Sequence, residues 1–494
     1  MSNLKHWEDK IKQKRKNTDF REFVKEIASW LVLNLYKRED YISKYPNTDR
    51  SPKIDSIEYL NNFEKGINYN SQLDLFTNYK TLFDNVYFQN VSANFQNENS
   101  LFSDATFGTK NTYLSFVIGM EAENILYSAF SYINVTNVFN SFFVNNGSQN
   151  IYFGGGIINS FNIFYSKYIT NSSDIWFSTN LIGCQDCIFC NGLENKKYCI
   201  DNKEYLKEEY IILKNNILKQ KDKFILNYEH ISRNSGINYS SKNIVSGYYN
   251  IKCENIENGY WINNMYDVRN MVCGGGGDHS EYFYDVIDAG VDSNNFYGVC
   301  GSGTSNNIFC SIYIDESSYI YYSWFMENCS NCIGCIGLKN KSYCILNKQY
   351  TKEEWYELAD KIFSQMEDSG TLGKFFPGYI NPYYFNDTFA YLIDDSFTKQ
   401  EVENEGYMWR ESEINVDIPE GYHIIGVNDL SDYQGYDSNG NWQINPEILK
   451  KVIKDEKGNI YRIVQMEYDF LMKHGLPLPE IHWLDRIKMG FKFK

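Results

Sequence analysis

Apolar and polar residues repeat along most of this chain with a period of about 12 residues. At each repeat an Asn, an Asp or a Tyr precedes an apolar or aromatic triplet. These marking residues are Asn99, Asn111, Asn124, Asn137, Asn150, Asn162, Asp174, Asp186 and Tyr198 in the first half, and Asn243, Asn255, Asp267, Asn295, Asn307, Tyr319, Asn331 and Tyr343 in the second. Such regular spacing indicates an internal repeat.

Two apolar columns run through the repeats. One follows the marking residue and the other lies six positions later, as in Ile151, Ile163 and Ile175, and in Ile157, Ile169 and Leu181. Short β-segments stacked about 4.8 Å apart would align each column, and Asn side chains of successive coils would hydrogen-bond to one another. The pattern predicts a β-solenoid. The alternative, a sandwich of antiparallel strands, gives no reason for one residue type to recur in one column.

Each repetitive tract ends in a cysteine module with the spacing C-x2-C-x2-C-x8-C. The two modules contain Cys184, Cys187, Cys190 and Cys199, and Cys329, Cys332, Cys335 and Cys344. Four thiolates at this spacing suit a closed tetrahedral zinc site, so we expect two structural zinc ions. Two alternatives stay open. Cys187 and Cys199 continue an apolar column and could be core residues, and iron–sulfur ligation also begins with C-x2-C-x2-C, although with a shorter final gap.

A helical pattern follows each module. Thr351 and Glu354 form a capping box, after which Trp355, Leu358 and Ile362 recur at helical spacing. The expected fold class is therefore mainly β: a duplicated β-solenoid in which each half is closed by a cysteine module and a helix. The expected regions are a helical N-terminal segment (1–60), two solenoid halves (61–235 and 236–370) and an α+β C-terminal region (371–494).

Composition and charge exclude some functions. The chain has 494 residues, a formal net charge of −16 and 17% aromatic residues. A protein that binds nucleic acid over a large surface needs a broad basic tract. The one basic run here, Lys10–Lys16, is expected to be a solvated helix face. The N-terminus does not have the pattern of a secretory signal, and the longest early apolar run, Ala28–Leu35, is too short to cross a bilayer. We therefore expect synthesis in the cytoplasm and no membrane insertion.

Other candidate chemistry lies in a Gly-rich stretch, Cys273–Asp285, that interrupts the repeat. Asp278, His279 and Glu281 could bind a metal or act as an acid/base pair, but a glycine-rich corner is the simpler interpretation. The remaining cysteines have no ligand spacing and are expected to be core residues: Cys253, Cys273, Cys300 and Cys310.

The module C-x2-C-x2-C-x-G-L-x-N-K-x-Y-C-I-x-N-K-x-Y-x-K-E-E-[YW] resembles one in an uncharacterised family from uncultivated small-genome bacteria and environmental phages. The resemblance continues through Phe375–Pro377, Asn386–Ala390, Trp409 and Pro477–Pro479. It implies a zinc-ribbon-like C-terminal tail. Here His482 and Asp485 stand where that tail would have cysteines, so we expect a metal-free remnant that packs through its aromatic residues.

Three functions are compatible with this sequence. The first is a non-enzymatic, zinc-stabilised structural or binding protein, part of a surface or virion assembly, with protein partners, self-assembly as a homo-oligomer, or glycan contacts. The second is a polysaccharide-binding or polysaccharide-cleaving enzyme, which would need carboxylates gathered on one face; the stretch Asp278–Asp292 is the only candidate. The third is an acidic mimic of nucleic acid, which rests on net charge alone.

Overall fold

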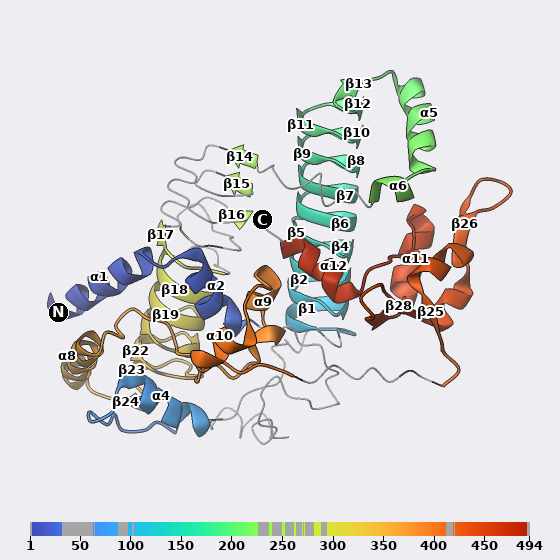
Figure 1. Ribbon diagram of the computed structural model, residues 1–494. Helices are drawn as coiled ribbons and strands as arrows, with labels where there is room; N and C mark the ends of the chain where they lie inside the picture. Colours follow the sequence, from blue (N-terminus) through green and yellow to red (C-terminus); the bar gives the residue numbers. More distant parts are fainter. Residues whose placement is uncertain are drawn as a thin grey trace. The chain divides into compact units, whose positions relative to one another are not determined.

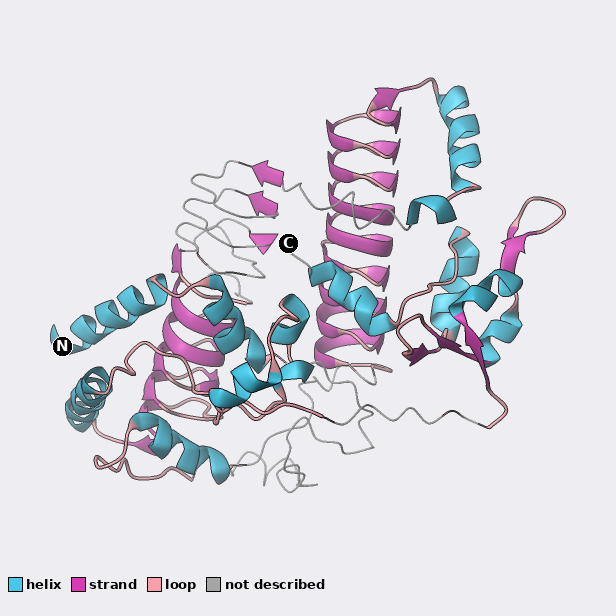
Figure 2. Ribbon diagram, in the orientation of Figure 1, coloured by secondary structure: helices cyan, strands magenta, loops and turns pink. Residues whose placement is uncertain are grey.

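The computed structural model describes residues 2–31, 63, 65–86, 97–100, 103–225, 237–239, 249–251, 261–262, 269, 271, 281–287, 294–411, 418 and 420–491. The fold is mainly β, with β-solenoid coils and with helices near both ends of the chain (Figures 1 and 2). The predicted β-solenoid and its 12-residue spacing are confirmed.

Contacts divide the chain into two compact units, each made of two separate stretches. Unit 1 contains Met1–Val91 and Gly236–Arg410, and unit 2 contains Ser92–Ser235 and Glu411–Lys494. The division between residues 235 and 236 coincides with an expected boundary. Residues 371–494, which we expected to form one region, are divided between the two units.

Unit 2 contains a 13-stranded sheet whose strands stack as the rungs of a solenoid (Figure 1). The strands are β1 (Asp104–Tyr113), β2 (Phe116–Leu126), β3 (Ala129–Tyr132), β4 (Thr136–Phe139), β5 (Phe142–Asn145), β6 (Gln149–Ile158), β7 (Phe161–Thr170), β8 (Ser173–Trp176), β9 (Thr179–Ile182), β10 (Gln185–Ile188), β11 (Asn191–Glu194), β12 (Lys197–Ile200) and β13 (Lys203–Glu204). Pairing is parallel, as in Ile163↔Ile175 and Ile169↔Leu181, which lie 12 residues apart. Only the pairing of β12 with β13 is antiparallel among these described strands.

Every third residue of a coil points into the solenoid interior. Ile163, Ser166, Ile169 and Ser172 are all buried, so apolar residues and serines alternate around the interior. Most interior serines make the same two hydrogen bonds. Ser172 Oγ accepts the backbone N–H of Cys184, 12 residues later, at 3.0 Å and donates to the carbonyl of Thr170 at 2.8 Å. The sequence pattern identified the two apolar columns but not these two serine columns.

Every third residue is also left-handed, one position before each interior residue. Asp174, Phe177 and Asn180 have φ values of 59°, 47° and 55°. The left-handed region disfavours most L-residues, and Asn, Asp and Gly adopt it most readily. The marking Asn residues occupy one such column, and their carboxamides form the predicted ladder: Asn150 Nδ2 donates to Asn162 Oδ1 at 3.0 Å, and Asn162 Nδ2 to Asp174 Oδ1 at 3.0 Å.

Unit 1 repeats this arrangement in an 8-stranded sheet. Its strands are β17 (Glu281–Phe283), β18 (Asn294–Ser302), β19 (Asn306–Asp315), β20 (Ser318–Tyr321), β21 (Trp324–Glu327), β22 (Ser330–Ile333), β23 (Ser342–Ile345) and β24 (Lys348–Gln349). A three-stranded parallel sheet in the same unit comprises β14 (Ile237–Tyr239), β15 (Tyr249–Ile251) and β16 (Trp261–Ile262). Ser305 and Ser311 begin serine columns here, because their hydroxyls accept the N–H groups of Ser317 and Ser323 at 3.1 Å.

Helices pack on the unit 1 solenoid. They are α1 (Ser2–Lys16), α2 (Phe20–Ile27), η1 (Ala28–Trp30), α4 (Leu75–Asp84), α8 (Lys352–Asp368), η3 (Phe385–Asp387), α9 (Phe389–Ile393) and α10 (Lys399–Asn404). Trp30 forms an edge contact with Trp324 of the solenoid at 5.1 Å between ring centroids. The predicted capping box is confirmed, since Thr351 Oγ1 accepts the N–H of Glu354 and the Glu354 carboxylate accepts that of Thr351.

In unit 2 the solenoid is followed by α5 (Lys207–Leu218) and α6 (Asp222–Ile225). The C-terminal stretch contributes β25 (His423–Gly426), η4 (Val427–Tyr433), β26 (Gln434–Tyr436), β27 (Trp442–Ile444), η5 (Pro446–Lys450), β28 (Lys451–Lys454), β29 (Ile460–Tyr461), α11 (Gln465–His474) and α12 (Trp483–Phe491). It packs on the solenoid through aromatic rings, as expected for the tail: Phe470 stacks on Phe139 at 4.3 Å and Trp483 on Tyr127 at 5.9 Å.

The ladder and the left-handed backbone can be tested separately at Asn162. Asn162→Gly removes both carboxamide bonds but permits φ of 58°, and we expect a loss of about 1 kcal/mol in the free energy of unfolding. Asn162→Ala removes the same bonds and also strains the backbone, so we expect a further loss of about 1 kcal/mol. Urea-induced unfolding followed by circular dichroism measures both. Equal losses would show that residue 162 is not left-handed in solution.

Candidate functional site: the interior cysteine clusters

The cysteines of the first module lie in the last coils of the unit 2 solenoid. Cys184, Cys187 and Cys190 follow one another at intervals of three and therefore all face the interior, where none is more than 2% exposed. Cys199 pairs in register with Cys187 on the next rung, β10 with β12. The fold therefore brings together the four residues that the spacing singled out, inside the solenoid rather than in a separate loop.

Each cysteine continues a column that other residues begin. Cys187 follows Ile175 in an apolar column. Cys184 and Cys190 follow serines, since their N–H groups donate to Ser172 Oγ and Ser178 Oγ, both at 3.0 Å. Our sequence analysis assigned only Cys187 and Cys199 to an interior column. A search for a three-residue interior period, with Ser between the apolar positions, would have placed all four cysteines inside.

The second module has the same arrangement in unit 1. Cys332 and Cys344 continue the column of Ile320, with registers Ile320↔Cys332 and Cys332↔Cys344. Cys329 and Cys335 follow serines, because their N–H groups donate to the hydroxyls of Ser317 and Ser323 at 2.9 and 3.0 Å. All four cysteines are buried. Cys300 and Cys310 are buried as well, as predicted, whereas Cys253 and Cys273 lie outside the described residues.

The thiols of each cluster interact around one central sulfur. Hydrogen bonds with Cys184 and Cys190 raise the pKa of Cys187 above its usual range, so Cys187 keeps its proton. The hydrogen bond from Cys187 lowers the pKa of Cys184 to about 6. The thiol of Cys199 also contacts that of Cys187. Cys332 is the corresponding centre in unit 1, and its hydrogen bond lowers the pKa of Cys329 to about 7.

The chemistry of these donors suits zinc. A tetrahedral zinc site needs four sulfurs about 2.3 Å from a common point. Here the thiol of Cys187 interacts with the other three thiols of its cluster, and Cys184 Sγ and Cys190 Sγ contact the carbonyls of Leu193 and Ile188, both at 3.3 Å. Across the described part of the chain, no group of three or more His, Cys, Asp or Glu side chains is arranged to hold a metal ion. Zinc binding stays a prediction of the spacing alone.

The Gly-rich stretch contributes a buried ion pair. Asp278 and His279 lie outside the described residues, and so does the side chain of Glu281. Asp285 is fully buried and accepts a hydrogen bond from Arg15 Nε, while Arg15 Nη1 donates to Glu26 at 2.7 Å. Burial raises the pKa of Asp285 to about 6, against the opposing effect of Arg15. Asp285 is therefore a structural group and does not face a cleft.

The same ion pair corrects one sequence interpretation. We expected the basic run Lys10–Lys16 to be a solvated helix face, and Lys14 and Lys16 are indeed exposed on α1. Arg15, however, is only 1% exposed, because its guanidinium is directed at Asp285 on the solenoid. The prediction is wrong at this residue, since its partner lies 270 positions away in the sequence.

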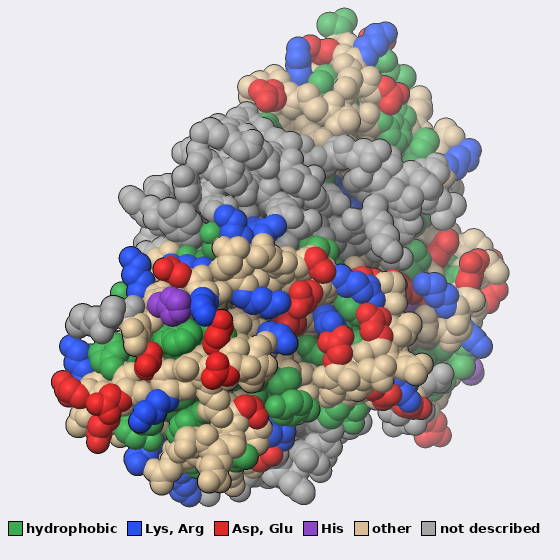
Figure 3. Space-filling model, turned by 60° about the vertical axis from the view of Figure 1, so that its left-hand side comes forward, with side chains coloured by type: hydrophobic (Ala, Val, Ile, Leu, Met, Phe, Trp, Pro, Cys, Tyr) green, Lys and Arg blue, Asp and Glu red, His purple; other side chains and the backbone are tan. Residues whose placement is uncertain are grey.

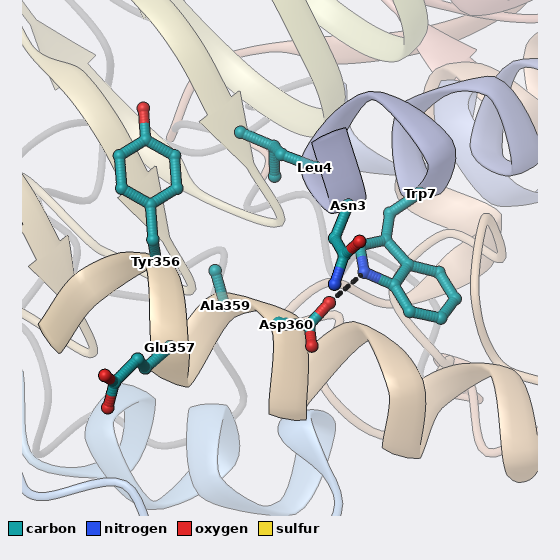
Figure 4. Close-up of a pocket in the computed structure, with 7 residues that line it drawn as sticks. All are labelled: Asn3, Leu4, Trp7, Tyr356, Glu357, Ala359 and Asp360. Atoms are coloured by element: carbon teal, nitrogen blue, oxygen red, sulfur yellow. Dashed lines mark hydrogen bonds between the residues drawn. The ribbon is translucent and has the colours of Figure 1, made fainter. Parts of the chain in front are cut away.

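A small surface pocket lies between α1 and α8 (Figure 4). Its volume is about 280 Å³. It is lined by Asn3, Leu4, Trp7, Tyr356, Glu357, Ala359 and Asp360. Trp7 Nε1 donates to Asp360 Oδ1 at 2.9 Å across it. The lining contains the carboxylates of Glu357 and Asp360 and the hydroxyl of Tyr356, but no histidine or cysteine.

Comparisons of this chain with protein-family models, with curated proteins and with solved structures find no match. In the part of the chain that the structure describes, no helix is both long enough and apolar enough to span a bilayer. Function must therefore be argued from the fold and from the clusters themselves.

The buried ion pair predicts unequal effects for two arginines of the N-terminal helices. Arg15→Met leaves Asp285 buried and unpaired, so we expect a loss of about 3–5 kcal/mol in the free energy of unfolding. Arg21→Met, the matched control, removes a 42%-exposed arginine that pairs with Asp394 and Glu401, and should cost about 1 kcal/mol or less. Chemical denaturation of both variants tests this.

Adding Asp285→Asn to Arg15→Met should restore part of the loss, because no buried charge then remains unpaired. Equal effects of the two single arginine substitutions would contradict a buried pair.

Proposed function

We propose that the protein is a non-enzymatic structural or binding scaffold made of two matched solenoid halves. The match extends beyond the cysteines. In each half the last parallel strand turns back into a short antiparallel strand, with registers Cys199↔Glu204 and Cys344↔Gln349, and a helix follows. This common order supports an internal duplication in which a cysteine module and a helix close each half.

The observation that carries the proposal is the filled and hydrogen-bonded interior. In unit 2 the interior residues from Ile118 to Cys199 form one continuous buried cluster. Their backbone groups pair from rung to rung, and the serine hydroxyls pair with the backbone. An enzyme on such a fold would need carboxylates converging on an open face. Asp285, the described carboxylate of the only candidate stretch, is instead buried against Arg15.

The surface supports a binding role better than a role with nucleic acid. Basic and acidic side chains are interspersed on the face drawn in Figure 3. Ion pairs are also found among the described residues, such as Lys25 with Glu405 at 2.6 Å. Such a face offers no broad basic tract to phosphates. The Asn ladder presents a row of carboxamides at the spacing of the rungs, which suits protein or glycan contacts. We propose protein partners or self-assembly, in a virion or another surface assembly.

A polysaccharide assay tests this function against the enzymatic alternative. The intact chain is incubated with a panel of neutral and acidic polysaccharides, while new reducing ends and retention in affinity electrophoresis are measured. We expect no reducing ends above background, whether or not a polysaccharide is retained.

Products that accumulate in proportion to the protein would contradict the proposal. Their loss in Glu281→Gln, but not in the matched control Glu327→Gln, would place an active site in the Gly-rich stretch. Glu327 suits the control because it is half exposed and pairs only with Lys339 among the described ion pairs.

A further inference from the structure

The serine columns follow one hydrogen-bonding rule in most of the described coils. The hydroxyl at one interior corner accepts the backbone N–H of the residue 12 or 13 positions later, on the next coil. In unit 2, Ser160 Oγ accepts from Ser172 and Ser166 Oγ from Ser178, at 3.1 and 3.0 Å. Without the hydroxyl, each of these buried N–H groups would lack a partner at the corner, where the strand-to-strand ladder is interrupted.

The corner cysteines obey the same rule. Cys335 Sγ accepts the N–H of Asn347, 12 residues later, at 3.4 Å. Cys184, Cys190 and Cys329 have the same relation to the backbone of Lys196, Asn202 and Lys341, which interacts with their thiols from 12 residues later. In all four cases the cysteine is the last acceptor of its column, because Lys or Asn stands at the next position.

The change from oxygen to sulfur coincides with the reversal of the chain. The N–H to Ser Oγ distances in unit 1 are 2.9–3.1 Å, whereas the N–H of Asn347 lies 3.4 Å from Cys335 Sγ. Directly after that residue the chain turns back into β24. A thiol is larger than a hydroxyl, so it can still contact a backbone that is leaving the regular spacing.

Packing accounts for the other two cysteines of each module. One layer of regular coil contains Ser172, Ile175, Ser178 and Leu181, whereas the next contains Cys184, Cys187, Cys190 and Leu193. Cysteine is smaller than isoleucine and larger than serine, so the exchange moves volume from the apolar column to the two corners. The layer stays filled without a metal ion, in keeping with the close packing of protein interiors.

We infer that the eight module cysteines are interior ladder residues that end the serine and isoleucine columns as thiols, and that the modules hold the solenoid ends together without a metal. This goes beyond the proposed scaffold function. If it fails, that function still stands, since the polysaccharide assay judges it separately.

Substitutions that recreate the preceding coil test the inference. Cys184→Ser with Cys190→Ser restores the hydroxyl acceptors found one coil earlier, and adding Cys187→Ile recreates the whole layer around Ile175. We expect both variants of the full chain to keep a thermal unfolding midpoint within about 4 °C of the unchanged protein. Cys184→Ala with Cys190→Ala, the matched control, removes the acceptors of the Lys196 and Asn202 N–H groups and also leaves interior volume unfilled, so it should lower the midpoint by more than about 4 °C.

Metal analysis completes the test. Protein purified without added metal should contain well under one zinc per chain, and a strong chelator should leave its unfolding midpoint unchanged. If the modules are zinc sites, the unchanged chain will contain two zinc ions. The double-serine and double-alanine variants will then each lose one ion, and their unfolding midpoints will fall by the same amount. That result would overturn the inference.

Discussion

The hydrogen bond from a backbone N–H to the interior side chain 12 residues earlier is the interaction on which the rest of this fold depends. It ties each coil to the next, and it forms in 13-residue coils as well as in 12-residue coils, since the N–H of Ser141 donates to Ser128 Oγ and that of Ser172 to Ser160 Oγ, both at 3.1 Å. It needs a small polar residue at a corner, between the isoleucines and leucines of the two apolar columns, and coils that have Ala122, Val135 or Gly154 at a corner lack it there. The buried serines from Ser148 to Ser178 meet this requirement, and the corner cysteines meet it where the columns end.

The same geometry constrains the residue before each interior position. The coil turns by placing every third residue in the left-handed region, which is unfavourable for most side chains. In the marking column, Asn and Asp adopt the left-handed conformation more readily than other residues, and their side chains hydrogen-bond to one another along the ladder. Gly183 serves the same purpose in another column, where φ is 62° and a Cβ would lie 2.4 Å from Asn195 Oδ1. Aromatic residues fill further left-handed positions, where Tyr165 and Phe177 stack at 5.3 Å.

Much of the solenoid could be predicted from the sequence, because the same residue preferences recur at the same position in many coils. The period, both apolar columns, the Asn ladder and the capping box at Thr351 all follow from residues close in sequence. The serine columns were missed because a Ser between apolar residues looks like an outward polar position when a strand period of two is assumed. The buried Arg15 and the division of residues 371–494 could not be predicted, since both depend on contacts between residues hundreds of positions apart. The cysteine spacing predicted four clustered thiols correctly, yet it could not distinguish a metal centre from a ladder end.

Native-state hydrogen exchange, resolved to single amides, tests the central claim most directly. The account predicts that the N–H groups of Lys196 and Asn202, which donate to cysteine sulfur, exchange as slowly as that of Cys190, which donates to Ser178 Oγ. The exposed turn residue Ser438 provides the fast reference in the same unit. If Lys196 and Asn202 exchange as fast as Ser438 in metal-free protein, the thiols do not end the ladder, and the account of the solenoid ends is contradicted.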